Sequence, residues 1–278
     1  MKESCEMLSQ EPSSAGKPWP LPVSQLPSFT QHVFFEKRTR YACVIPVLNE
    51  GERIRTQLER SREILQRVDT VIVDGGSNDG STDLGRMRES GIRGLLIKTG
   101  PGRLSAQLRI GIAFAMAEGY EGVVLIDGNN KDEPEEIERF IQRLDAGDDH
   151  IQGSRFIAGG RAVNNPWSRI LAIRLLHAPL LSAASRVRYT DTTNGFRAYS
   201  RSFLLDERVQ PFRSVFTDYE LHYYLARAAG RLGFRVREVG VTRSYPAGKI
   251  PTKIQGMRGN LKILRTLWAV VRGYYDPR

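Results

Sequence analysis

Cysteines and long apolar runs are both scarce in this sequence of 278 residues. The two cysteines, Cys5 and Cys43, cannot build a disulfide framework, so we expect a reducing compartment and a cytoplasmic protein. No stretch approaches the roughly 20 apolar residues of a membrane span. The polar N-terminus also lacks the apolar segment of a signal peptide. Any membrane contact is therefore expected to be peripheral.

The motifs of several nucleotide- and metal-binding classes are missing as well. A dinucleotide-binding fold needs G-x-G-x-x-G after its first strand, whereas residues 46–53 read PVLNEGER. No G-x-x-x-x-G-K-[ST] occurs, which disfavours a P-loop. The four histidines are scattered, so a zinc site is not expected. With no cysteine nucleophile either, we expect any group transfer to be a single inverting displacement.

Basic residues, in contrast, are abundant. The chain has 41 lysines and arginines against 31 aspartates and glutamates, a net charge of +10. Such an excess suggests an anionic partner, which could be nucleic acid, an acidic membrane surface or a phosphorylated ligand. A nucleic-acid-binding module would gather basic residues and aromatics on one surface, but here the charge is spread through both halves. We therefore expect no nucleic acid partner.

The order of apolar and polar segments predicts the fold class. Residues 1–36 are dense in proline and serine and lack periodicity, which predicts a disordered leader. From Tyr41, apolar runs expected to be strands alternate four times with amphipathic segments. These runs are residues 41–48, 69–76, 94–100 and 122–127. The alternation is typical of βαβ units, so we predict an α/β domain over residues 37–250 with a doubly wound, mostly parallel sheet.

Residues 251–278 predict a basic amphipathic helix. Its apolar side carries Leu261, Leu264, Leu267, Trp268, Val271 and Tyr274. Its positive charges are Lys253, Arg258, Lys262, Arg265 and Arg272. This composition suits a helix lying on an anionic membrane. Packing against the domain or against a second subunit, as in a homodimer, explains the pattern equally well.

Polar residues at the ends of the predicted strands are the candidates for chemistry, because ligands bind outside the carboxyl ends of such sheets. Asn49 and Glu50 follow the first strand, Asp74 ends the second and Asp127 ends the fourth. Asp74 precedes two glycines and could instead cap a turn. Asp127 opens the stretch DGNNKDEP, in which amides and a lysine follow where further acids might stand.

A series of segments in order resembles family 2 glycosyltransferases of the GT-A fold. CVIPVLNE, VIVDGGSNDGST, GPGRLSAQLRIGIAFA and LIDGNNKDEPEE resemble the family's strand ends, Gly-rich helix start and D-x-D region. IQGSRF, TDTTNGFRAYS and TRSYPAGK resemble the branch of dolichyl- and polyprenyl-phosphate hexose (mannose) synthases. The resemblance spans about residues 40–253. It implies an enzyme that moves a hexose from a nucleoside-diphosphate sugar.

The resemblance also assigns a donor and metal site. Pro46, Leu48 and Glu50 would border the nucleotide, and Asp74 would meet its base or ribose. Asp127 would hold a divalent cation, Mg²⁺ or Mn²⁺, against the diphosphate. Asn129 replaces the second acid of D-x-D and would be a neutral metal ligand, while Lys131 could supply part of the missing positive charge. Asp132 could swing in as a ligand or begin the next helix. We therefore expect a weakly bound metal.

Further basic residues match the branch as phosphate clamps. Arg155 matches the family's G-S-R arginine, and Arg243 and Lys249 reproduce the branch's spacing of an arginine and a lysine. Arg169 matches an arginine of the branch more loosely and Arg197 is common in relatives, but either could instead be a surface charge. An acceptor hydroxyl would need a general base, whereas an ionised phosphate would not. The candidates for that base are Asp218, Glu220 and, with a structural role more expected, Asp191.

The acceptor stays open between two classes. A polyprenyl phosphate is favoured by the branch resemblance, and the alternative is a glycan or small-molecule hydroxyl. A nucleotidyltransferase would share the predicted sheet, but it would carry G-x-G-[ST]-R-L in the first turn, which PVLNEGER does not match.

Overall fold

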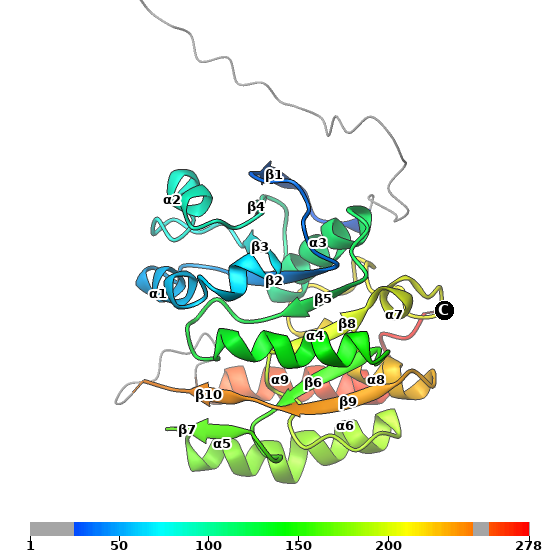
Figure 1. Ribbon diagram of the computed structural model, residues 1–278. Coiled ribbons are helices and arrows are strands. Elements are labelled where there is room, and N and C mark those ends of the chain that lie inside the picture. The colour runs from blue at the N-terminus through cyan, green and yellow to red at the C-terminus, as the bar shows by residue number, and fades with distance from the viewer. Residues whose placement is uncertain (1–24, 247–255, 278) are drawn as a thin grey trace, which may run out of the picture.

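The computed structural model describes residues 25–246 and 256–277, and its centre is an eight-stranded sheet covered by helices on both faces (Figure 1). The strand order is β1-β4-β3-β2-β5-β8-β6-β9. In that order the strands are Phe29–Val33, Gly94–Lys98, Asp69–Asp74, Tyr41–Val47, Gly122–Leu125, Arg197–Ser200, His150–Ser154 and Val236–Gly240. The strands β4, β3, β2 and β5 run parallel, and a second small sheet pairs β7 (Arg161–Val163) with β10 (Thr242–Ser244). The predicted α/β class with a mostly parallel sheet is confirmed.

The predicted leader is wrong for residues 29–33. These residues form β1, which pairs antiparallel with β4 at the edge of the sheet. Most of its side chains are exposed or half-buried, so the segment has no apolar alternation that a sequence pattern could reveal. Backbone hydrogen bonds to an open sheet edge hold it instead. Residues 1–24 of the predicted leader lie outside the described part of the chain.

Helices follow the strands as the alternation predicts. They are α1 (Glu52–Arg60), α2 (Leu84–Glu89), α3 (Leu104–Ala117), α4 (Ile137–Asp145), α5 (Trp167–Ala172), α6 (Ala178–Ser185), α7 (Arg201–Leu205), α8 (Glu220–Arg231) and α9 (Gly256–Val271). Short 3-10 turns lie at η2 (Ile64–Gln66) and η3 (Pro134–Glu136), and a π-helical turn, η4 (Ile173–His177), joins α5 to α6. Strands β9 and β10 are separated by one residue in the chain but belong to different sheets.

Two apolar clusters bury the two faces of the sheet. Successive residues of β2 alternate between them: Ala42 and Val44 join one cluster, while Cys43, Ile45 and Val47 join the other. This two-sided burial explains why the parallel strands read as continuous apolar runs. Helices α3, α7 and α8 cover the first face, and α1, α2 and α4 cover the second.

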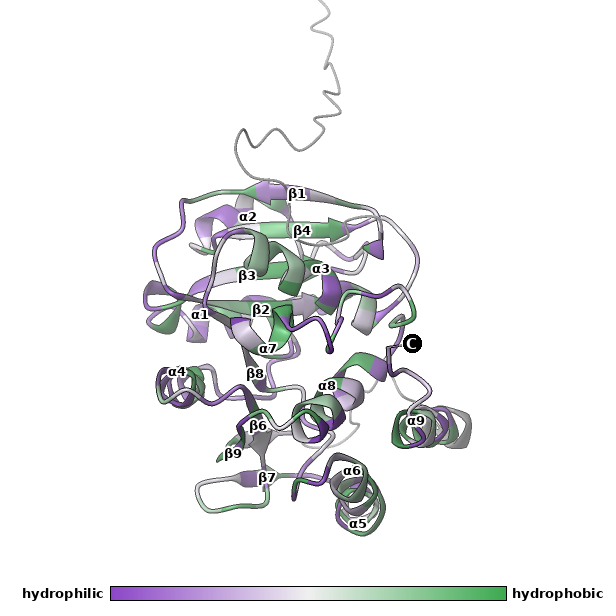
Figure 2. Cartoon of the chain, turned by 90° about the vertical axis from the view of Figure 1, so that its right-hand side faces the viewer, coloured by the Kyte–Doolittle hydropathy of each residue, from purple (hydrophilic) through white to green (hydrophobic). Residues whose placement is uncertain are grey.

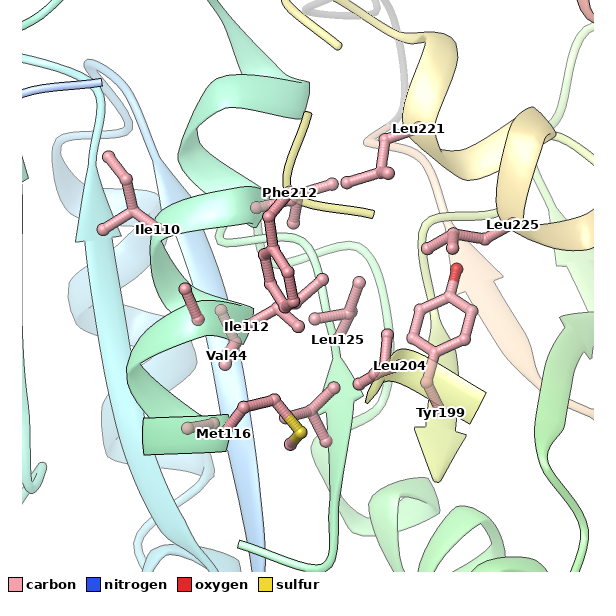
Figure 3. Packing of buried hydrophobic residues seen from close by; sticks show 14 of the residues in the cluster. Val44, Ile110, Ile112, Met116, Leu125, Tyr199, Leu204, Phe212, Leu221 and Leu225 are labelled. Atoms are coloured by element: carbon pink, nitrogen blue, oxygen red, sulfur yellow. The ribbon is translucent and has the colours of Figure 1, made fainter. Parts of the chain in front are cut away.

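Helix α3 is the most deeply buried helix segment of the first cluster. From Ser105 to Met116 every residue is buried, and Gly111 lies so close to the sheet that a Cβ would stand 2.4 Å from Val44 Cγ1. Ile112 of α3, Leu125 of β5 and Phe212 point toward one another in Figure 3. Each such fully buried side chain contributes about 1.5–3 kcal/mol to the free energy of unfolding. The strand ends beside α3 are therefore held rigidly.

The C-terminal helix α9 packs on the domain through one face. Ile263, Leu267 and Val270 are buried in a third cluster together with residues of α6 and α8. Figure 2 views α5, α6 and α9 nearly end-on, on the same side of the molecule. Leu261 and Trp268 of α9 remain exposed. Within the described residues, no helix has the length and apolar character that crossing a bilayer requires.

Candidate active site

The carboxyl ends of β2, β3 and β5 meet at one edge of the sheet, because these neighbouring strands are parallel. The side chain of Gln107 on α3 ties two of them together: its Nε2 donates to the carbonyls of Val47, at 2.8 Å, and Val73, at 2.9 Å. Asp74 ends β3, and Asp127 lies two residues beyond β5. The sequence prediction that these acids share one edge is thus met, and Gln107 is a positioning residue that it missed.

Asp127 stands where two glycines allow the chain to pack closely. A Cβ on Gly195 would lie 2.5 Å from Asp127 Oδ1, so the NGF turn can approach the carboxylate only with glycine at this position. A Cβ on Gly128 would lie 2.8 Å from Val47 Cγ2. Any larger residue at either position would displace the carboxylate or the end of β2.

Arg243 bridges two carboxylates of the D-x-D region. Its Nη2 lies 2.8 Å from Asp127 Oδ2, and its Nη1 donates to Asp132 Oδ2. All three groups come together because Arg243 forms a backbone bridge with Asp132, and the amide of Ser244 donates to the carbonyl of Lys131 at 2.7 Å. Asp132 therefore does more than begin the next helix: it holds the arginine.

The two carboxylates respond differently to this arginine. Burial acts to raise the pKa of Asp127, but the adjacent Arg243 guanidinium outweighs it and lowers that pKa. Burial and the charge of Asp127 together raise the pKa of Asp132, although Arg243 opposes them. The site therefore keeps one firmly ionised carboxylate at Asp127.

Four cations surround Tyr245, and we call these five residues the Tyr245 cluster. The charged end of Lys131 lies 5.1 Å from the ring centroid, that of Arg169 5.4 Å and that of Arg243 5.9 Å. Arg169 Nη1 also donates to the Tyr245 hydroxyl at 2.9 Å. Burial acts to raise the pKa of Tyr245, but Arg243, Arg169 and then Arg155 lower it. The structure thus brings together Lys131, Arg155, Arg169 and Arg243, which the sequence analysis named one by one, and adds Tyr245.

Arg155 reaches the cluster as one half of a buried ion pair. Its Nε lies 2.7 Å from Asp191 Oδ2 and its Nη2 lies 2.9 Å from Asp191 Oδ1, a bidentate arrangement. Burial acts to raise the pKa of Asp191, but Arg155 outweighs it and lowers the pKa. The structural role expected for Asp191 is the one that its contacts support.

Arg197 does not join the phosphate clamp. Its guanidinium is fully buried and donates to three backbone carbonyls, those of Asn194 at 3.0 Å, His222 at 2.6 Å and Thr192 at 2.8 Å. It therefore fixes the turn that contains Gly195, next to Asp127. The interpretation of Arg197 as a phosphate ligand is wrong, because every nitrogen is directed at the protein backbone. Lys249 lies outside the described residues.

The turn after β3 is closed by Asp74. Its Oδ1 accepts hydrogen bonds from Ser77 N at 2.9 Å and Ser77 Oγ at 2.7 Å, and its Oδ2 accepts one from Thr82 Oγ1 at 2.7 Å. Asp74 is buried. The turn-cap alternative thus has direct support, and contact with a nucleotide stays a prediction.

The turn after β2 is tied to the turn after β3. Asn49 Oδ1 accepts from Asn78 N at 2.9 Å, and Glu50 N donates to Ser81 Oγ at 2.9 Å. Glu50 is buried, and its carboxylate accepts a 2.8 Å hydrogen bond from Arg53 Nε. Of the other residues predicted to border the nucleotide, Pro46 lies within β2 and Leu48 directly follows it. These residues line the same strand edge as Asp127.

The other two general-base candidates, Glu220 and Asp218, are also engaged in contacts with the protein. Glu220 Oε2 accepts from the backbone amides of Thr217, at 3.1 Å, and Asp218, at 2.7 Å, so it caps the start of α8. Asp218 forms an ion pair with Lys262 of α9. Neither contact resembles a base held ready for a substrate proton.

The fit of a divalent cation rests on three side chains. Asn129 Oδ1 and Asp132 Oδ1 are buried oxygens without a hydrogen-bond partner. Both residues lie near the ionised Asp127, because Asn129 Nδ2 donates to Asp127 Oδ2 at 3.4 Å and Arg243 links Asp132 to Asp127. Oxygen ligands of this kind suit Mg²⁺ or Mn²⁺. Among the described residues, however, no three histidine, cysteine or acidic side chains group as a metal site. The site fits a cation only weakly. Asn129 carries no charge, and both Asp127 and Asp132 already pair with Arg243.

A helical surface beside the Tyr245 cluster is strongly apolar and uncovered. Trp167 of α5 is 78% exposed, Leu171 51%, and Leu175 of the following π-helical turn 72%. No residue of α5 is buried. Arg169 of the same helix turns inward to Tyr245. Nothing in the sequence of residues 165–185 indicates that this apolar side would stay exposed.

Comparison with known proteins agrees with this architecture. Residues 42–206 match the model of the family described as glycosyl transferase family 2. The polyprenol monophosphomannose synthase of Mycolicibacterium smegmatis is 29% identical over 206 residues, 73% of this chain and 77% of that protein. The undecaprenyl-phosphate mannosyltransferase of Micrococcus luteus is 29% identical over 207 residues, 73% of this chain and 83% of that protein.

Solved structures show the same fold. Glucosyl-3-phosphoglycerate synthase from Mycobacterium tuberculosis, in complex with Mn²⁺, UDP-glucose and phosphoglyceric acid, superposes with a TM-score of 0.61 at 19% identity, covering 87% of this chain and 81% of that one. Its complex with phosphoglyceric acid gives a TM-score of 0.60 at 20% identity, with 87% and 81% covered. At such identities the likeness concerns the fold.

Proposed function

The chain belongs to glycosyl transferase family 2 and is a glycosyltransferase, and we propose that it transfers a hexose, with inversion, from a nucleoside-diphosphate sugar to a polyprenyl phosphate. The observation that carries this proposal is the Tyr245 cluster beside Asp127. Its four cations lie at the carboxyl edge of the sheet, where such folds bind their ligands.

The donor diphosphate is the anion that this cluster suits. As the bond between the anomeric carbon and the diphosphate oxygen breaks, negative charge grows on the leaving group. Lys131 and Arg243 lie beside Asp127, and preorganised cations at this point stabilise that charge. Asp127 and Asn129 would hold a weakly bound Mg²⁺ or Mn²⁺ that adds to the same neutralisation. Pro46, Leu48, Glu50 and Asp74 would border the nucleotide, and Lys249 would add a further phosphate contact.

The acceptor that best fits is already an ionised phosphate. Its oxygen attacks the anomeric carbon directly, and no proton has to leave in that step. This agrees with the engagement of Glu220 in capping α8 and of Asp218 with Lys262. Arg169 supplies positive charge on the cluster's side next to α5, where the acceptor phosphate would bind, and the charge of Arg155 acts on the same tyrosine, Tyr245.

The exposed apolar surface explains where a lipid acceptor would be met. Trp167, Leu171 and Leu175 lie on the same helical segment as Arg169, whose guanidinium contacts Tyr245. A bilayer surface would cover these side chains and bring a lipid phosphate to the cluster. The two named relatives above act, by their names, on polyprenol and undecaprenyl phosphate, which supports a lipid acceptor and a peripheral membrane enzyme.

The test compares membrane binding and transfer. We expect the full chain to sediment with anionic liposomes and less so at high salt, because each lysine or arginine near the surface adds about 1 kcal/mol. The double variant Trp167→Ser/Leu175→Ser should lose sedimentation and transfer to a polyprenyl phosphate in liposomes. The control is Leu84→Ser, which removes an exposed leucine from α2, remote from α5 in Figure 1.

Other outcomes decide between the remaining acceptors and partners. No liposome binding, together with transfer to a glycan or small hydroxyl compound, would overturn the lipid acceptor. A concentration-dependent dimer that is lost in the double variant would show that α5 is a homodimer surface instead. Nucleoside-diphosphate sugars with uridine, guanosine and thymidine bases are tested in parallel to identify the donor.

A further inference from the structure

One arginine holds the oxygen that a metal would need. A divalent cation at this site would take Asp127 Oδ2 or its partner oxygen as an anionic ligand. Arg243 Nη2 already lies 2.8 Å from Asp127 Oδ2, and the same guanidinium binds Asp132. Arg243 is only 7% exposed, so water does little to weaken these pairs.

The two carboxylates that could bind a metal already have two cations beside them. Asp127 and Asp132 together contribute at most two negative charges, and Arg243 and Lys131 contribute two positive ones. Adding a divalent cation alone would leave a buried excess of positive charge, which is costly. Adding a diphosphate as well restores the balance, because its negative charges can take Arg243 and Lys131 as partners.

We propose that Arg243 is an exchangeable counter-ion: in the donor-free protein it occupies Asp127 and Asp132 and suppresses metal binding, and the donor diphosphate draws it away so that the metal enters with the donor. This inference rests on the proposed nucleotide-sugar donor. By linkage, the metal then strengthens donor binding by the same factor by which the donor strengthens metal binding.

The position of Arg243 supports exchange more than a fixed structural role. Arg155 is matched by one buried carboxylate in a bidentate pair, which is a closed arrangement. Arg243 instead divides its nitrogens between two carboxylates, one of which, Asp127, has a side chain that is 24% exposed. An oxygen of Asp132 also stays buried without a hydrogen-bond partner. A ligand that draws the guanidinium away would leave oxygens ready for a cation.

The experiment measures Mn²⁺ binding to the full chain without nucleotide, by the electron paramagnetic resonance signal of free Mn²⁺. We expect weak binding to the wild type and binding about tenfold tighter or more to Arg243→Gln, within the range typical of coupled sites. Arg169→Gln is the matched control: it removes a cation of the same cluster that pairs with a tyrosine hydroxyl, so Mn²⁺ affinity should change far less. Adding Asp127→Asn to Arg243→Gln should abolish the gain.

Two further measurements keep the inference open to failure. Arg243→Lys should give an intermediate Mn²⁺ affinity, because one ammonium cannot bridge both carboxylates, and it serves if Arg243→Gln does not fold. With UDP, GDP or dTDP present, the wild type should gain Mn²⁺ affinity, after correction for the metal–nucleotide complex in solution, and Arg243→Gln should gain little. Equal nucleotide-free affinities in folded wild type and variants would overturn the counter-ion role.

This result is independent of the acceptor. If Mn²⁺ binding follows the expected pattern but no polyprenyl phosphate is glycosylated, the proposed acceptor fails and the counter-ion stands. If transfer occurs while Arg243→Gln leaves Mn²⁺ affinity unchanged, the proposed function stands and the counter-ion fails.

Discussion

The turns after β2 and β3 and the Tyr245 cluster lie at the same sheet edge but are built differently. The turns are joined by short hydrogen bonds among neighbouring polar residues, such as Asn49 to Asn78 and Asp74 to Ser77. The cluster is held by ion pairs between distant segments, such as Arg243 to Asp127. The turns are thus shaped before any ligand arrives, whereas the cations of the Tyr245 cluster can exchange their carboxylate partners for phosphates.

The difference has an energetic side. A hydrogen bond between neutral groups contributes about 0.5–1.5 kcal/mol net to the free energy of unfolding, and one to a carboxylate, as at Asp74, about 1.5–3 kcal/mol. Buried charges in the cluster are individually costly and are tolerated only as matched sets. Changes in the cluster should therefore alter activity or stability steeply, and changes in the turns should act more gently.

The largest effect should come from Asp127→Asn. The variant keeps the size of the side chain beside Gly195 but removes the ionised oxygen that pairs with Arg243 and that, in the proposed function, would hold the metal against the diphosphate. We expect transfer to fall by about 10³-fold, at the upper end of single electrostatic contacts in active sites. Steady-state transfer rates and a thermal melt check this together. Near-normal turnover in a folded variant would contradict the site.

Next in size is Arg155→Met, which tests stability within the cluster. Removing the arginine leaves Asp191 buried and unpaired, at a cost of about 3–5 kcal/mol in the free energy of unfolding. In the wild type the pKa of Asp191 is lowered, so its stabilisation is present above the unfolded pKa and is lost as pH falls through the folded one.

Denaturant titrations across pH separate this explanation from a general packing loss. The wild type should lose stability below about pH 4, the ordinary pKa of an aspartate. Arg155→Met should lose less on acidification, because protonation relieves its unpaired Asp191. Parallel acid dependence in the two proteins would show that the ion pair contributes nothing specific.

The positions of the turns after β2 and β3, and of the acids at the strand ends, could be predicted because they depend on residues close in the sequence. Strand, turn and helix between residues 41 and 127 follow from apolar runs and turn residues close in the chain, so Asp74 and Asp127 are placed by pattern alone. The four cations of the cluster were named one by one from motif resemblance. Their convergence on Tyr245 depends on how β10 returns to the D-x-D region, which no local pattern encodes.

The sequence could not predict which groups each arginine side chain would bind. Arg197 and Arg243 both follow motif-like segments, yet one binds backbone carbonyls and the other binds carboxylates. Strand β1 was missed because an edge strand can form with little buried side-chain surface. The exposure of the apolar side of α5 was not foreseen either, since periodicity tells which residues share a face but not what covers it.

A moderate effect on stability is expected for Asp74→Asn in the turn after β3. The amide keeps the volume but cannot accept from both Ser77 and Thr82 as two carboxylate oxygens do. We expect a loss of about 1–3 kcal/mol in the free energy of unfolding. If Asp74 also meets the nucleotide, donor affinity should fall as well. Ser77→Ala weakens the same turn without touching the nucleotide, so equal losses of donor affinity in both would assign Asp74 to the turn alone.

The smallest effect should come from Asp218→Asn. This variant tests whether an acid remote from the Tyr245 cluster acts as a general base. Asp218 pairs with Lys262, whose side chain is 55% exposed, and exposed pairs contribute about 0–1 kcal/mol. With a phosphate acceptor no proton is removed, so transfer to a short polyprenyl phosphate should stay within about twofold of the wild type. Lys262→Gln is the matched control, because it breaks the same pair and leaves the carboxylate. A collapse of the transfer rate in Asp218→Asn, with Lys262→Gln unaffected, would identify Asp218 as a general base and a hydroxyl as the acceptor.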